Sequence, residues 1–82
     1  NPVTTIEFEL AQPSVVSLKL YNLLGAEVAS LLSEESLDGG AQSVDFEALS
    51  LPSGVYLYRI TARSTGETPA TFSAVRKMVL LK

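Results

Sequence analysis

Residues 4–10 read Thr-Thr-Ile-Glu-Phe-Glu-Leu and alternate apolar and polar side chains. Because successive side chains of an extended strand point to opposite faces, Ile6, Phe8 and Leu10 share one face. An amphipathic helix would instead place its apolar residues three or four positions apart. The stretch therefore predicts a β-strand with one buried face.

Similar patterns recur along the chain. Residues 15–21 and 42–47 also alternate, residues 54–60 are rich in β-forming side chains, and residues 71–81 close the predicted fold. Residues 26–37 are ambiguous, because their apolar side chains have helical spacing and Ala, Glu and Leu favour helix. Since this stretch lacks a strong N-cap and lies among strands, we expect a strand near 27–33.

Turn signals separate these segments. They lie at residues 11–14, 22–25, 38–40, 49–54 and 64–69. The first predicts a hairpin between the first two strands, and the last predicts a mobile polar tip. Six or seven short strands with a turn signal every 8 to 12 residues are typical of a β-sandwich or barrel.

Composition limits the possible functions. The 82 residues are 46% hydrophobic, contain no cysteine and carry a net charge of −3. They suffice for one small core without disulfides, and the charge argues against non-specific nucleic-acid binding. No apolar run is long enough to span a membrane as a helix. Because the chain begins Asn1-Pro2 without a methionine, we expect a single domain, residues 1–82, excised from a longer protein.

Residues for catalysis or metal binding are scarce. Without histidine or cysteine, the chain lacks the commonest general base, metal ligands and thiol nucleophile. Glu7 and Glu9 share a strand face, which favours a solvating role over paired-carboxylate catalysis. Glu34, Glu35 and Asp38 approach a double glycine, but their spacing differs from that of an EF-hand, so an acidic loop is expected ahead of a calcium site. We expect no enzyme activity, no metal site and no cofactor.

Tyr56 and Tyr58 lie two residues apart on one expected strand, after a loop that contains Pro52. A tyrosine soon after such a loop often fills the core and donates its hydroxyl hydrogen bond back to that loop. The alternative is a pair of rings that stack on a carbohydrate. We favour the structural role.

The chain end combines basic and apolar residues. It reads Arg76, Lys77, Met78, Val79, Leu80, Leu81, Lys82. Met78 and Leu80 lie on one face and Val79 and Leu81 on the other, so both faces are apolar. Either the strand is central and buried on both sides, or one face is available to a partner.

Five segments, in order, resemble the C-terminal sorting domains of the type IX secretion system, which are found in Bacteroidota and related bacteria. Residues 1–6 resemble the family's Asn-Pro motif with its Thr pair, and residues 20–28 its apolar-Tyr-Asn-x-x-Gly-x-Glu-Val motif. Residues 39–46 resemble its next strand, where an aromatic residue is usual. Residues 51–56 resemble its Leu-x-x-Gly-x-Tyr motif, and residues 76–82 its basic, apolar terminal strand.

The resemblance implies an immunoglobulin-like (FlgD-type) antiparallel β-sandwich of about seven strands. It implies a sorting signal that directs an N-terminal cargo through the periplasm and across the outer membrane, to the cell surface or the medium. Residues 76–82 would be read by the outer-membrane translocon, and a sortase-like peptidase would often remove the domain. The residues that would carry the structural motifs are Tyr21, Asn22, Gly25, Gly54 and Tyr56. The alternative is a structural or carbohydrate-binding accessory module.

Overall fold

The computed structural model describes residues 3–47, 51–66 and 69–81. These residues form six strands and no helix. The strands are β1 (Val3–Leu10), β2 (Ser14–Tyr21), β3 (Glu27–Leu37), β4 (Gly40–Glu47), β5 (Gly54–Ser64) and β6 (Thr71–Leu80). The predicted all-β fold is confirmed, with six strands in the described residues in place of about seven.

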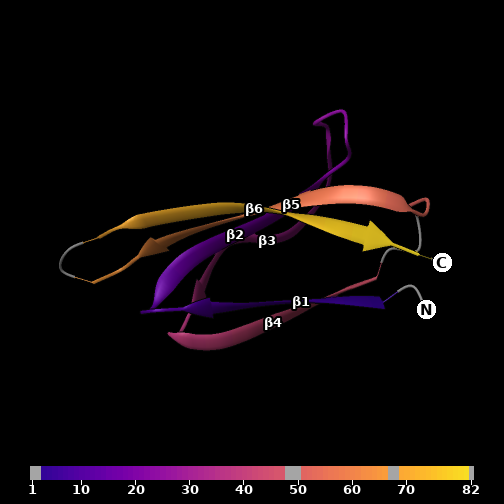
Figure 1. Ribbon diagram of the computed structural model, residues 1–82. Coiled ribbons are helices and arrows are strands. Elements are labelled where there is room, and N and C mark those ends of the chain that lie inside the picture. The colour runs from indigo at the N-terminus through magenta and orange to yellow at the C-terminus, as the bar shows by residue number, and fades with distance from the viewer. Residues whose placement is uncertain (1–2, 48–50, 67–68, 82) are drawn as a thin grey trace.

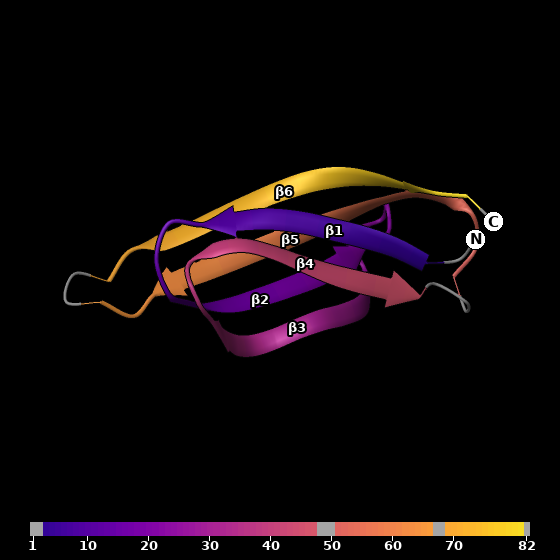
Figure 2. The same cartoon turned by 90° about the horizontal axis from the view of Figure 1, so that it is seen from below.

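The strands form two antiparallel sheets that pack as a sandwich (Figure 1). β1 and β4 make a two-stranded sheet, and the other four strands are ordered β3-β2-β5-β6. Seen from below in Figure 2, β1 and β4 lie across one face of the larger sheet. The core between the layers consists of Ile6, Leu10, Val16, Leu18, Leu20, Tyr56, Ile60, Ala62, Met78 and Leu80.

The predicted hairpin between the first two strands is wrong. β1 pairs with β4, whereas β2 pairs with β3 and β5, so residues 11–13 carry the chain from one sheet to the other. Each strand turns apolar side chains toward the other layer. In opposite layers these side chains pack against each other across the core, as alternating strands of a sandwich do.

β3 confirms the strand that was expected near 27–33 and extends it to Leu37. Its helix-like apolar spacing comes from register shifts. Ala29 pairs with Leu20 and Leu32 pairs with Leu18, so partners two residues apart on β2 meet residues three apart on β3. A bulge adds one residue in this way and bends the strand.

The remaining predicted strands are confirmed, and β5 continues beyond residue 60 to Ser64. The predicted turn at residues 38–40 is tight, because Gly40 has φ of 108° and a Cβ on Gly39 would lie 3.2 Å from the backbone of Gln12. Glycine tolerates the positive φ at Gly40 and the close approach to Gln12 at Gly39 at low cost, because it has no Cβ. Of the predicted polar tip, residues 67 and 68 lie outside the described residues.

Candidate functional site

The strand β6 lies at an edge of the four-stranded sheet. Among the described residues it pairs with β5 alone, from Arg63 opposite Thr71 to Gly54 opposite Leu80. The alternative of a central strand buried on both faces is therefore wrong. An edge strand leaves one row of backbone N–H and C=O groups available to a further strand.

The two faces of β6 differ sharply in exposure. Met78 and Leu80 point into the core and are 8% and 1% exposed, whereas Val79 is 54% exposed. Leu81, directly after the strand, is 74% exposed. At Met78 and Leu80 the inward face therefore belongs to the core, whereas the outward face is open to solvent. Lys82 lies outside the described residues.

The outward side chains of β6 join others on the same side of the sheet. Val79 lies opposite Val55, and Leu57, on the same face of β5, lies opposite Tyr21 of β2. A shallow depression forms where Tyr21, Gly25, Leu57, Arg59 and Val75 meet. We call this surface the outer patch. Its members are Tyr21, Val55, Leu57, Val75, Val79 and Leu81.

Cations border the outer patch. Lys77 lies opposite Leu57, and the Arg59 guanidinium stands 5.9 Å from the centroid of the Tyr21 ring. The sequences of β5 and β6 contain no acidic residue. Arg76 points to the other face, since it lies opposite Tyr58, and its guanidinium donates to the Val75 carbonyl at 3.1 Å. Arg76 and Lys77, the two basic residues that start the terminal motif, thus lie on different faces of the sheet.

The β2–β3 turn stands beside this surface. In Figure 1 it projects from the four-stranded sheet on the side away from β1 and β4. The Asn22 side-chain oxygen accepts hydrogen bonds from the Leu24 and Ala26 N–H groups, each at 3.0 Å. Gly25 has φ of 88°, a region that glycine adopts without strain. The motif residues Asn22 and Gly25 therefore fix the turn, and its tip exposes Leu23 and Leu24.

The predicted role of Tyr56 is confirmed. Its ring is buried in the core, and its hydroxyl donates to the Pro52 carbonyl at 2.7 Å. A buried ring is not available to stack on a carbohydrate. Tyr58 is half-buried against the same core, and Gly54 begins β5 opposite Leu80.

The acidic residues form no catalytic or metal-binding cluster in the part of the chain that the structure describes. Glu7 and Glu9 are exposed on the outer side of β1, and Glu34 contacts Arg63 at 3.9 Å. Within the described ranges, no three side chains of the types that bind metals lie close enough to hold an ion. No helix among these residues is long and apolar enough to cross a membrane.

A small immunoglobulin-like sandwich with an exposed apolar edge strand belongs to the class of recognition or structural domains. A comparison with protein families matches residues 1–72 to the secretion system C-terminal sorting domain, and the chain belongs to this family. It is a C-terminal sorting signal for type IX secretion, and such a domain is not itself catalytic. The matched residues end at Phe72, before the residues predicted to be recognised.

This membership has two consequences. A sorting domain works with the type IX secretion machinery, is carried on a cargo chain and directs secretion across the outer membrane. The accessory-module alternative is not favoured. A search of curated proteins and a search of solved structures found no match.

Proposed function

We propose that the type IX machinery recognises this domain through residues 76–82, and that the outward side chains Val79 and Leu81 make the main contact. The observation that carries the proposal is the split between the two faces of the strand. Met78 and Leu80 are used by the core, while Val79 and Leu81 keep more than half of their surface in water. Exposed apolar side chains gathered in one patch mark interaction sites.

Two further features support recognition at this surface. The outer patch continues from β6 onto β5 and β2, so a partner that covers Val79 also meets Val55 and Leu57. Lys77 and Arg59 border it and would orient an acidic partner surface as it approaches. Edge pairing along β6 would add backbone hydrogen bonds to these side-chain contacts.

In this proposal the partner is the outer-membrane translocon. Residues 1–82 act as one domain at the C-terminus of a secreted cargo, which passes through the periplasm before it reaches the surface or the medium. A sortase-like peptidase then removes the domain. The domain supplies the sorting signal, and the cargo supplies any enzymatic or binding activity.

The test is a fusion of this domain to the C-terminus of a periplasmic reporter in a host with a working type IX system. The double variant Val79→Ser/Leu81→Ser should lower surface delivery about tenfold or more, since burial of either side chain against a partner is worth about 1.5–3 kcal/mol. Its thermal unfolding should stay close to that of the original domain, because both side chains are exposed.

Phe72→Ser is the matched control. Phe72 lies on the same strand and is 59% exposed, but it points to the opposite face of the sheet, beside Ala62. Its delivery should equal that of the original fusion. Equal delivery of the double variant and the original domain would refute recognition through Val79 and Leu81.

A further inference from the structure

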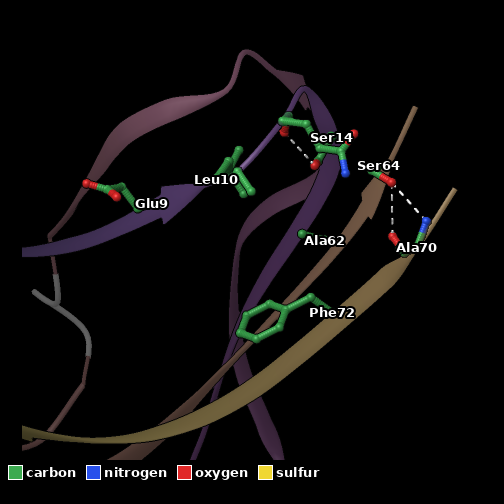
Figure 3. Close-up of a pocket in the computed structure, with 9 residues that line it drawn as sticks. Glu9, Leu10, Ser14, Ala62, Ser64, Ala70 and Phe72 are labelled. Carbon is green, nitrogen blue, oxygen red and sulfur yellow. Dashed lines mark hydrogen bonds between the residues drawn. The ribbon is translucent and has the colours of Figure 1, made fainter. Parts of the chain in front are cut away.

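A groove runs between β1 and β6 on the inner side of the four-stranded sheet. Its two connected hollows have volumes of about 260 and 310 Å³ and share Glu9, Leu10 and Phe72. Figure 3 shows Leu10 and Phe72 on opposite sides of one of these hollows. The apolar side chains that line the smaller hollow are Phe8, Leu10, Tyr58, Ile60, Phe72 and Ala74.

The groove exists because the two layers differ in width. Neighbouring strands are about 4.8 Å apart, so a two-stranded sheet is about 10 Å narrower than a four-stranded one. The consequence shows at Phe72, which points to the same side as its buried neighbour Ala62 and is nevertheless 59% exposed. The inner face of β6 is therefore buried at Met78 and Leu80 and uncovered at Phe72.

Both walls of the groove are strand edges. β1 pairs only with β4, and β6 pairs only with β5, in the part of the chain that the structure describes. A strand laid beside β1 would extend the smaller sheet from two strands to three. It would satisfy the open backbone groups of residues 5–10 and cover the apolar floor in the same step.

We propose that this groove takes a further β-strand, an extended segment of a partner protein that pairs with β1. Its inward side chains are apolar and lie over Phe72 and Ala74. Its outward side chains are Lys or Arg. The surface lies on the opposite side of β6 from the outer patch, so this site is independent of recognition through Val79 and Leu81.

The acidic outer side of the β1–β4 sheet favours Lys or Arg as the outward side chains of the added strand. The outer side of the β1–β4 sheet carries Glu7, Glu9, Asp45 and Glu47, and neither strand contains a cation. Cross-strand neighbours on one face lie about 5 Å apart, so outward side chains of an added strand would stand next to Glu7 and Glu9. Opposite charges there favour pairing, and like charges oppose it. Arg76, which also lines the groove, disfavours a cation on the inward side.

The experiment titrates this domain with a synthetic octapeptide that alternates Lys and Val, blocked at both ends, and follows backbone amides by NMR. We expect saturable binding, with slower hydrogen exchange in residues 5–10. An octapeptide that alternates Glu and Val has the same apolar face and should bind at least about tenfold more weakly, a difference of 1.4 kcal/mol.

Three variants test where the peptide binds. Phe72→Lys places a cation on the groove floor and should weaken binding about tenfold or more, whereas Val79→Lys on the outer face should leave binding unchanged. Glu7→Lys/Glu9→Lys alters only exposed positions and should reverse the preference toward the Glu–Val peptide. This reversal is a second readout that does not depend on the Phe72 variant folding.

Three results of the titration would overturn the proposal, and a fourth comes from its control. The first is the absence of saturable binding at millimolar peptide. The second is equal affinity for the two peptides. The third is exchange protection at β3, the other edge of the four-stranded sheet, without protection at β1. Sedimentation of the domain without peptide is the accompanying control, since a dimer that protects residues 5–10 would show that a second copy fills the groove and would also refute it.

Discussion

The inward and outward faces of the four-stranded sheet both carry Val and Leu side chains, but these side chains serve different purposes. On the inward face, Leu18, Leu20 and Leu80 are almost completely buried under β1 and β4. On the outward face, Val75, Val79 and Leu81 remain in water, because no second layer lies there in the described residues. Exposure therefore follows from the covering layer, and the apolar character of a residue does not determine it.

This difference separates stability from recognition. An inward apolar side chain stabilises the fold by leaving water, at about 25 cal/mol for each Å² of apolar surface. An outward one gains little from folding, so substituting it should leave the folded state intact. Variants of neighbouring residues on β6 can test whether the two faces are as distinct as their exposure indicates.

The largest effect is expected for Leu80→Ala. Leu80 is 1% exposed and lies in the core, so the change removes buried methyl groups and leaves a cavity. Such substitutions cost about 2–5 kcal/mol, which is a large share of the stability of a small domain. Urea unfolding followed by far-UV circular dichroism should show a much lower midpoint, with the slope little changed.

Leu81→Ala is the matched control, because it makes the same chemical change one residue later on an exposed side chain. Its free energy of unfolding should stay within about 0.5 kcal/mol of the original value. Similar losses in the two variants would mean that the outward face is also covered, and the comparison between the faces would fail.

A smaller effect is expected for Tyr56→Phe. The change keeps the buried ring and removes the hydroxyl that donates to the Pro52 carbonyl at 2.7 Å. Loss of one such hydrogen bond costs about 1 kcal/mol. Tyr58→Phe is the control, since the Tyr58 hydroxyl has no hydrogen-bond partner among the described residues, and it should change the unfolding midpoint much less. Equal effects would show that the bond to Pro52 does not stabilise the loop.

The alternating patterns predicted the all-β class and most strand positions, because the period of two is a local property of the backbone. These patterns could not show whether β1 pairs with β2, because residues 11–14 suit a tight turn and a crossing between sheets equally well. Pairing depends on which faces meet across the core, and that is a long-range property.

The terminal strand β6 shows the same limit. Residues 76–81 are apolar on both faces, so their sequence fits a central strand as well as an edge strand. Only the strand order β3-β2-β5-β6 places them at an edge, and only the position of β1 and β4 makes Met78 and Leu80 the inward pair. The Tyr56 bond was predictable because it joins residues four apart in sequence.

The smallest effect is expected for an ion pair on the outward face. The Lys19 ammonium lies 3.5 Å from a Glu27 carboxylate oxygen, and both side chains are more than 40% exposed. Exposed pairs of this kind contribute about 0.2–1 kcal/mol. A double-mutant cycle of Lys19→Met and Glu27→Gln should give a coupling energy at the low end of this range.

Salt provides the control for that cycle. The coupling should shrink further in about 1 M salt, where the screening length falls to about 3 Å. A coupling well above 1 kcal/mol that resists salt would mean that Lys19 and Glu27 are shielded from water. Something would then cover the outward face near β2 and β3, and the open surface inferred for partner recognition would have to be confined to the Val55, Val79 and Leu81 side of the sheet.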